Sequence, residues 1–443
     1  MKKYRFFLIG CMLFAFLSAD AFTVVFNISN YDRSKKISFF LTAEEKEHLV
    51  ETDQLGSGVF SLDNEPSQYV YMQYGEKKQV LFVESGKKLI VYWEDGELPL
   101  LRFEGDGAKI NEYLNSRKLI GVRNRDNKLN ESDFLKKLDD LYAYNCQVLK
   151  DAELPDFFDK IEMERLKYFI YDKMFFYPLY HKHLAKDTTY VPTGTFYDKV
   201  KILAKLDEHL LFLPEYRNFL INGISYLSQW DGKKTQNGSL RSAMYVDQYV
   251  ESVRIREMLI NYYVFTYIKN RGLNGADELV ALFKKHVTST ELVQKFDELC
   301  GTWTRLADGC YAPDFSCVDI NGKAITLEEL KGKPIYIDVW ATWCVPCRKE
   351  IPYLQELEQE YGDKINFVSI SIDKDKKSWK KMIQKGEMNG IQLHYDGNES
   401  FLNTYMIKGI PRFILLDKTG RIVSSNAVRP SNSKIVELFN QLL

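Results

Sequence analysis

The chain has 443 residues, which is too long for one ordinary hydrophobic core and predicts two or three domains. Hydrophobic residues make up 45% of the chain and aromatic residues 14%, which is ample for packed cores. The 60 basic and 61 acidic residues nearly cancel, to a formal net charge of -1. This balance offers neither the basic field that nucleic acid requires nor an acidic tail, so we expect no nucleic-acid partner.

The first 21 residues have the pattern of a secretory signal peptide. A positively charged start is followed by an apolar run over residues 6–17 and by the small-residue sequence Ala19-Asp20-Ala21. The apolar run is shorter than the ~20 residues that a membrane-spanning helix needs. We therefore predict a signal peptide over residues 1–21 that is cleaved during export, and a soluble mature chain.

A lipid anchor is the alternative interpretation of the same segment. Leu8-Ile9-Gly10-Cys11 resembles a bacterial lipobox, in which the cysteine is acylated after cleavage. Only a few apolar residues precede Cys11, and the apolar run continues beyond it. These two features favour the cleaved signal peptide over the lipid anchor.

Residues 22–105 have a strand pattern. Ile37, Phe39 and Leu41 are spaced two apart, which places them on one face of a strand. Residues 79–83 and 88–93 are two apolar runs separated by a turn that contains glycine, which predicts a hairpin. Several short strands at close spacing predict an antiparallel, β-sandwich-like domain.

Residues 106–300 change to a helical period. The apolar spacing predicts helices over residues 134–149, 161–176 and 249–269, and the last of these ends before Gly272. We expect an all-helical middle domain.

Residues 301–443 alternate between strand and helix patterns. Asn321-Gly322 predicts a hairpin turn between residues 315–319 and 323–326. Further elements are expected as strands at 335–340, 365–372, 412–417 and 421–425, and as helices at 344–361, 376–388 and 431–443. Such alternation is typical of an α/β domain with helices on the faces of a sheet.

The sequence Cys344-Val345-Pro346-Cys347 stands where the strand at 335–340 gives way to a helix. Unpaired N–H groups and the helix dipole at a helix start favour a thiolate, which is the attacking species in disulfide exchange. Pro346 is tolerated in the first helical turn, where its missing N–H costs little. Cys347 lies one turn along, within reach of the first sulfur, so the pair predicts a two-step disulfide exchange.

A zinc site and an inert structural disulfide are the two other interpretations of the cysteine pair. A tetrahedral zinc site needs four ligands, but no second pair of this kind exists and His394 is isolated in the sequence. An inert structural disulfide is disfavoured by the strand-to-helix context. We therefore expect redox chemistry at the cysteine pair, with no metal and no other cofactor.

The segment 338–352, Asp-Val-Trp-Ala-Thr-Trp-Cys-Val-Pro-Cys-Arg-Lys-Glu-Ile-Pro, resembles the active-site segment of the thioredoxin superfamily, in its TlpA/ResA-like branch. Ala312-Pro313-Asp314-Phe315 and Gly409-Ile410-Pro411 resemble the opening segment and the cis-proline loop of that branch. The whole layout resembles the larger TlpA-family proteins of Bacteroidetes. The resemblance implies a thioredoxin-like domain over residues 301–443.

The resemblance also implies an activity and a location. Such proteins are exported protein-disulfide oxidoreductases, so we expect the periplasm. Their clients are proteins with disulfides or thiols. Because they are usually supplied with electrons by a membrane-linked thiol donor, we expect a reductase.

Residue roles follow from the same resemblance. Pro411 is expected to form a cis bond and to pack against the cysteine pair, while Ile410 offers backbone groups to an extended client. Asp338 is expected to be buried and to transfer a proton for Cys347. Glu350 corresponds to an acidic residue near the site of ResA-like proteins, which lack the strand aspartate, and a solvated helix residue is the alternative.

Aromatic and apolar residues flank the cysteines. Trp343 is expected to cover one side of the pair, and Val345 and Pro346 to contact the client. Trp340 is expected to pack in the core.

A peroxidase is disfavoured, because peroxiredoxins share the fold but carry Thr or Ser three residues before the reactive cysteine, where this chain has Ala341. Two further questions stay open. Residues 22–300 could form a dimerisation or client-binding module, and a dimer could act as a disulfide isomerase. The pairing of Cys300, Cys310 and Cys317 stays open, and Cys146 is expected in a core.

Overall fold

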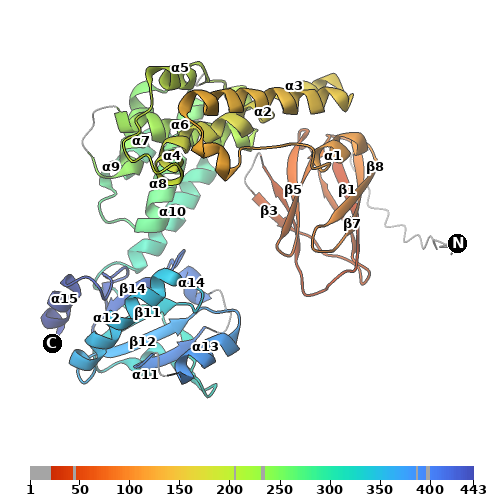
Figure 1. Cartoon of the computed structure of the whole chain (residues 1–443). Helices are drawn as coiled ribbons and strands as arrows, with labels where there is room; N and C mark the ends of the chain where they lie inside the picture. Colours follow the sequence, from red (N-terminus) through yellow and green to blue (C-terminus); the bar gives the residue numbers. More distant parts are fainter. Residues whose placement is uncertain (1–20, 43–45, 204–205, 231–234, 386–387, 396–399) are drawn as a thin grey trace. The chain divides into compact units, whose positions relative to one another are not determined.

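The computed structural model describes residues 21–42, 46–203, 206–230, 235–385, 388–395 and 400–443 (Figure 1). The predicted signal peptide and Cys11 lie outside these residues, apart from Ala21. The chain separates into two compact units. One contains the described residues up to 230 with Tyr249–Ile255, and the other contains Thr235–Gln248 with Arg256–Leu443. Within the described residues, no helix has the length and apolar character needed to cross a membrane.

The first unit begins with two four-stranded sheets. One sheet has the order β4-β1-β7-β8, and the other has the order β3-β2-β5-β6. The strands are β1 (Phe22–Ser29), β2 (Ile37–Leu41), β3 (Lys46–Leu49), β4 (Ser57–Leu62), β5 (Gln68–Tyr74), β6 (Lys77–Val83), β7 (Lys88–Glu94) and β8 (Leu100–Gly105). Side chains of both sheets share one core, in which Phe39 stacks on Phe60 with ring centroids 4.4 Å apart. The predicted β-sandwich-like domain is therefore confirmed.

Two details of the strand prediction are wrong. Strands β6 and β7 do not form the hairpin expected from residues 79–93, because β6 pairs with β5 while β7 pairs with β1 and β8. Strand β7 also runs parallel to β1, so the sandwich is not purely antiparallel. A glycine-containing turn shows that the chain bends. It does not show whether the next strand returns to the same sheet or crosses to the facing one.

A helical region follows the sheets, as predicted. In chain order its helices are α1 (Ala108–Leu114), α2 (Glu131–Asp151), α3 (Asp156–Tyr171), α4 (Tyr177–Leu184), α5 (Gly194–Leu203), α6 (Pro214–Leu227), α7 (Gly238–Tyr249), α8 (Val253–Arg271), α9 (Asp277–His286) and α10 (Thr290–Arg305). Short 3-10 helices lie between them: η1 (Asn124–Lys128), η2 (Asp172–Phe175), η3 (Glu208–Leu210) and η4 (Ser228–Trp230). The helices expected at 134–149, 161–176 and 249–269 correspond to α2, to α3 with η2, and to α8.

A buried ionic cluster joins the sheets to the helices in the first unit. Arg165 of α3 donates two hydrogen bonds to Glu162, at 2.6 and 2.7 Å, and one to Glu215 of α6 at 2.8 Å. Tyr69 of β5 and Tyr113 of α1 donate to the two oxygens of Glu162, at 2.5 and 3.1 Å. Glu162 is fully buried, so these partners replace the water that its charge has lost.

The last part of the chain is a mixed α/β domain with a seven-stranded sheet of order β10-β9-β13-β12-β11-β14-β15. Its strands are β9 (Ser316–Val318), β10 (Ala324–Thr326), β11 (Ile335–Trp340), β12 (Asn366–Ser371), β13 (Ile391–His394), β14 (Arg412–Leu416) and β15 (Ile422–Ser424). Its helices are α11 (Leu327–Leu330), α12 (Val345–Tyr361), α13 (Lys376–Gln384), α14 (Ser400–Thr404) and α15 (Lys434–Leu442). The predicted strands and helices are present, including the hairpin of β9 and β10 around Asn321-Gly322.

Strand β11 is the central element of this domain. It pairs in parallel with β12 and antiparallel with β14, and all six of its residues are buried. Helices α12 and α15 cover the same face of the sheet, where Leu354 and Phe439 belong to one buried cluster with Tyr336 of β11. The segment that leads into α12 therefore follows directly from a buried strand.

Candidate active site

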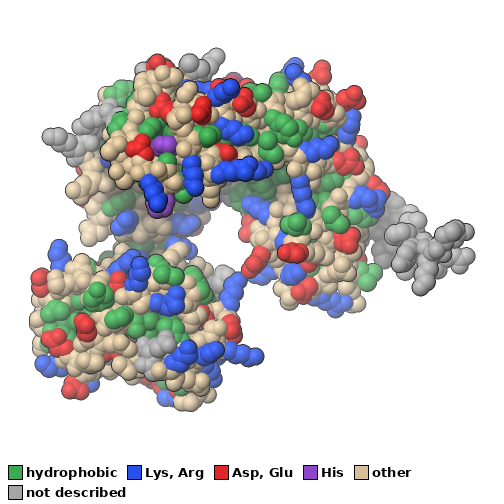
Figure 2. All heavy atoms as spheres, in the orientation of Figure 1, with side chains coloured by type: hydrophobic (Ala, Val, Ile, Leu, Met, Phe, Trp, Pro, Cys, Tyr) green, Lys and Arg blue, Asp and Glu red, His purple; other side chains and the backbone are tan. Residues whose placement is uncertain are grey.

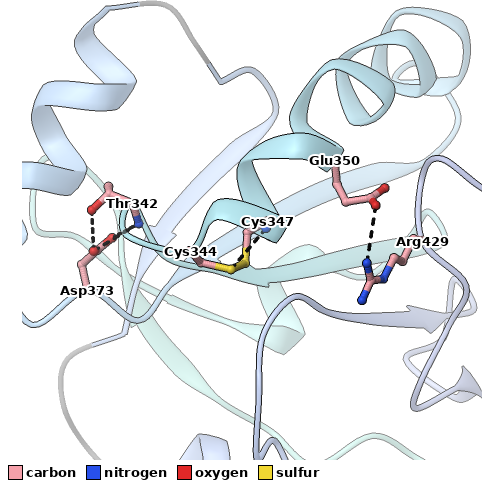
Figure 3. The surroundings of a disulfide bond; sticks show 6 residues. All are labelled: Thr342, Cys344, Cys347, Glu350, Asp373 and Arg429. Atoms are coloured by element: carbon pink, nitrogen blue, oxygen red, sulfur yellow. Dashed lines mark hydrogen bonds and ion pairs between the residues drawn. A yellow bond between two sulfur atoms is a disulfide. The ribbon is translucent and has the colours of Figure 1, made fainter. Parts of the chain in front are cut away.

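The two cysteines of the predicted pair form a disulfide at the start of α12 (Figure 3). Cys344 is the N-cap residue of the helix, and its Cα lies 5.3 Å from that of Cys347. The backbone N–H of Cys347 donates to the sulfur of Cys344 at 3.2 Å. In the reduced state this amide and the positive end of the helix dipole would stabilise a thiolate at Cys344.

The two cysteines of the site are buried, and the residues next to them in the sequence are exposed to solvent. Cys344 and Cys347 are only 4% and 3% exposed. Trp343 is 65% exposed and Val345 51% exposed, and Pro346 is exposed as well. A partner that approaches the disulfide therefore meets these three side chains. Trp340 is buried in a cluster with both cysteines, which confirms its predicted place in the core.

The turn before Cys344 is held by a carboxylate that the sequence analysis did not single out. Asp373, just after β12, accepts hydrogen bonds from the N–H of Thr342, at 3.0 Å to Oδ2, and from its hydroxyl, at 2.7 Å to Oδ1 (Figure 3). The hydroxyl of Ser371 donates to Asp373 at 2.7 Å and fixes its orientation. The only signal in the sequence was an Asp directly after a buried strand, which is common in loops.

The peptide bond between Ile410 and Pro411 is cis, as predicted. Ile410 packs against the apolar cluster that contains Cys344 and Cys347. Strand β14 begins at the next residue, Arg412, and pairs directly with β11. The loop thus lies beside the cysteine pair, although it is more than 60 residues away along the chain.

Asp338 lies in the middle of β11 and is buried. Asp338 lies two residues after Tyr336, so the two side chains point to the same face of the strand. Tyr336 belongs to a buried cluster with Leu354 of α12, so the side chain of Asp338 faces that helix as well. Burial, and then the charges of Glu350 and Glu358, raise the pKa of Asp338 from 3.8 to about 8. Its Oδ1 atom has no hydrogen-bond partner among the described residues. Asp338 can therefore take up or release a proton near neutral pH.

Glu350 is also buried, which argues against the alternative of a solvated helix residue. Its two oxygens accept hydrogen bonds from the N–H and hydroxyl of Ser431, at 3.0 and 3.1 Å. Nη1 of Arg429 lies 3.8 Å from Oε1 of Glu350 and forms an ion pair with it (Figure 3). Glu350 thus connects α12 to the segment before α15. The sequence did not reveal this contact, because 81 residues separate Glu350 from Ser431.

The other described cysteines, Cys146, Cys300, Cys310 and Cys317, form no disulfide in the structure. The disulfides considered between Cys300, Cys310 and Cys317 are therefore absent. Among the residues that the structure describes, no group of three or more His, Cys, Asp or Glu side chains is arranged to hold a metal ion. On the face shown in Figure 2, basic and acidic side chains are interspersed.

Residues 307–442 match the Redoxin family model. Thioredoxin-like protein YneN of Bacillus subtilis is 31% identical over 118 residues, which are 26% of this chain and 69% of that protein. The chain belongs to the thioredoxin superfamily. Thiol-disulfide oxidoreductase ResA of Bacillus cereus is 33% identical over 116 residues, which are 26% of this chain and 66% of ResA. The match therefore spans slightly less than two thirds of the length of ResA.

Solved structures resemble the same part of the chain. The thioredoxin domain of a thiol-disulfide oxidoreductase from Bacteroides vulgatus is 30% identical and covers 30% of this chain and 99% of its own, with a TM-score of 0.29. A thiol:disulfide interchange protein from a Bacteroides species is 31% identical and covers 31% of this chain and 88% of its own, with a TM-score of 0.28. The superfamily assignment thus concerns the C-terminal third of the chain, which is homologous to ResA-like thiol-disulfide oxidoreductases.

Proposed function

We propose that this protein is an exported thiol–disulfide oxidoreductase that reduces disulfides of client proteins in the periplasm. The observation that carries the proposal is the Cys344–Cys347 pair at the start of α12, with an amide N–H directed at the sulfur of Cys344. The match of residues 307–442 to the Redoxin family model and the similarity to ResA support it.

The reaction has two exchange steps. The thiolate of Cys344 attacks one sulfur of the client disulfide, an S–S bond forms between Cys344 and the client, and the other client sulfur leaves as a thiolate that takes up a proton. Cys347 then loses its proton and attacks Cys344. The client leaves as a dithiol, and the protein retains both oxidised cysteines as the Cys344–Cys347 disulfide.

Asp338 is the group proposed to accept the proton of Cys347. Its pKa of about 8 suits proton transfer near neutral pH, because a carboxylate of ordinary pKa would be too weak a base for a thiol. Its place on the face of β11 that α12 covers supports this role. A thiol donor linked to the membrane returns two electrons to the disulfide after each cycle.

The client is proposed to bind over the exposed residues of the site. Trp343, Val345 and Pro346 form the open surface beside the disulfide, and Ile410 offers backbone groups next to Pro411. Strand-like capture of an extended peptide uses such backbone groups and tolerates many client sequences. This arrangement suits an enzyme with several clients.

The proposed activity is tested by the reduction of insulin with a thiol donor. We expect turnover by the full chain, none by Cys344→Ser, and full turnover by Cys310→Ser, which removes a free thiol elsewhere in the same unit. Turnover that survives Cys344→Ser would contradict the proposal. Oxidation of a reduced, unfolded protein at a greater rate than insulin reduction would reverse the proposed direction.

The clients are identified by trapping. In Cys347→Ala the second step is blocked, so the mixed disulfide between Cys344 and the client should accumulate and survive non-reducing electrophoresis. The location is tested by sequencing the mature N-terminus. Cleavage after Ala21 supports the signal peptide, while an acylated Cys11 would replace it with the lipid anchor.

A further inference from the structure

Arg412 is the residue directly after the cis bond of Ile410–Pro411, and it begins β14. Its neighbour Phe413 packs in the core beneath α12 and α15. Since successive side chains of a strand point to opposite faces, Arg412 projects to the other face of the sheet. A displacement of its side chain would therefore shift the start of β14 and, with it, the adjoining Ile410–Pro411 loop.

Arg412 is only 8% exposed. Its side chain contacts two segments that are far apart in the sequence. Its Nε donates to the carbonyl oxygen of Ser425, the residue directly after β15, at 2.9 Å. The carbon at the centre of its guanidinium lies 5.9 Å from the ring centroid of Trp303, on α10. The start of β14 is thus connected to β15 and to the last helix before the redox domain.

The charge of Arg412 is poorly compensated. In the described part of the chain no carboxylate pairs with it, and its Nη2 atom has no hydrogen-bond partner. Burial lowers the pKa of Arg412 to about 10, which shows that its surroundings disfavour the cation. An apolar side chain of similar length would fill the same space without this cost. Stability alone does not explain an arginine here.

The position of Trp303 beside Arg412 depends on its contact with Gly272. It is buried, and Gly272, which directly follows α8 and adopts a φ of +80°, lies beside its ring. A Cβ atom at position 272 would stand 3.1 Å from Cε3 of Trp303. The absence of a side chain at Gly272 therefore lets the indole occupy this position.

The chain that follows α10 is hydrogen-bonded to the outer edge of β15. The N–H of Gly309 donates to the carbonyl oxygen of Ile422 at 2.7 Å, and the N–H of Ile422 donates to that of Cys310 at 2.8 Å. Strand β15 pairs in turn with β14. Helix α10 is thus connected to the start of β14 by two routes, through these backbone bonds and through Trp303.

We propose that Trp303 and Arg412 are positioning residues, which hold the start of β14 and so keep the Ile410–Pro411 loop in the geometry that binds a client. The inference rests on the proposed function, because it concerns the client site of that reaction. It assigns to helices α8 and α10 a part in client binding, although they lie outside the Redoxin match. The partner it concerns is an extended polypeptide that carries a disulfide.

The test is steady-state reduction of insulin by the full chain carrying Arg412→Met. We expect KM for insulin to rise about fivefold with kcat unchanged, because the loop is needed for binding and the cysteines are intact. The rate with cystine, which is too small to use the loop, should stay unchanged. The thermal midpoint should stay the same or rise, because an uncompensated buried charge is removed.

Substitutions on the other side of the contact give independent readings. Trp303→Leu and the remote Gly272→Ala should raise KM in the same way, and Trp303→Phe should restore it. The double variant of Arg412→Met and Trp303→Leu should raise KM no further than either single change, because both break one contact. Arg305→Met, an exposed arginine on the same helix, is the matched control and should leave KM unchanged.

The outcomes separate this inference from the proposed function. If the unaltered chain reduces no protein disulfide, the proposed function fails. If it does, and Arg412→Met leaves KM for insulin unchanged, the positioning role is wrong. A parallel loss of the rate with cystine and of thermal stability would show a general structural role and would also overturn the inference.

Discussion

The hydroxyl of Thr342 donates a hydrogen bond of 2.7 Å to Oδ1 of Asp373, and this bond joins the turn before the cysteine pair to the end of β12. The backbone N–H of Thr342 donates to the same carboxylate. Two residues later, Cys344 is the N-cap of α12. The position of the reactive sulfur thus depends on a carboxylate 31 residues away in the sequence.

Asp373→Ala should loosen this turn. It leaves the N–H of Thr342 without its acceptor, so we expect the free energy of unfolding to fall by about 1–3 kcal/mol. We also expect slower insulin reduction, because Cys344 would spend less time at the helix start. Denaturant titration and steady-state kinetics measure the two effects. The exposed Asp363→Ala is the control, and equal losses in both variants would contradict the specific role of Asp373.

Asp338→Asn should change the pH dependence of stability. The pKa of Asp338 rises from 3.8 in the unfolded chain to about 8 in the folded one, so the folded state holds the proton more tightly. The stability that this group contributes is complete below pH 4 and is lost as the pH rises towards 8. Relative to Asp338→Asn, the unaltered protein should therefore weaken progressively between these values. Urea titrations at several pH values test this, and a constant difference between the two proteins would refute it.

Asp338→Asn should also affect the second exchange step. The asparagine cannot accept the proton of Cys347, so the mixed disulfide on Cys344 should resolve more slowly while its formation is unaffected. Rapid-mixing experiments with a fluorescent client separate the two steps. Equal slowing of both would indicate a structural effect of the substitution instead.

The carboxyl group of Glu358 on α12 should also make the stability of the protein depend on pH, without involving the cysteines. Burial raises its pKa to about 7, and neither carboxylate oxygen has a hydrogen-bond partner among the described residues. Ionisation of this group therefore opposes folding as the pH rises through 7. Glu358→Gln should make the protein more stable than the unaltered chain above pH 7 but not at pH 4. The exposed Glu356→Gln is the matched control and should show no such pH-dependent gain.

Arg165→Met should destabilise the first unit strongly. It removes the cation that donates to Glu162 and Glu215 and leaves the fully buried Glu162 with two tyrosine donors but no opposite charge. Loss of one partner of a buried ion pair costs about 3–5 kcal/mol. The double variant with Glu162→Gln should recover part of this loss. Calorimetry measures both variants, and a double variant less stable than Arg165→Met would contradict this account.

Much of the active site could be predicted because its signals are local. Helix geometry alone places residues three apart on adjacent turns, so Cys344 and Cys347 were expected to be close. The buried character of β11 and the turn at Asn321-Gly322 likewise depend on neighbouring residues. The residue roles at Pro411 and Asp338 came instead from the resemblance to known proteins.

Other features depend on contacts that local patterns do not encode. Strands β6 and β7 look like a hairpin in the sequence, but they lie in different sheets of the sandwich. The sequence leaves Glu350 open between a residue near the site and a solvated helix residue, and its burial and hydrogen bonds to Ser431 argue against the solvated one. The hydrogen bonds that join Asp373 to the turn before Cys344 likewise exist only in the tertiary structure.

The sequence by itself determined the reactive pair, because a strand, a cap and a three-residue spacing define the local geometry of the two sulfurs. It also determined the order of sheet, helix and mixed regions through the period of the apolar residues. Only the tertiary structure decided which distant side chains hold that pair in place. Such contacts form when burial removes water from polar groups and makes a partner elsewhere in the chain necessary.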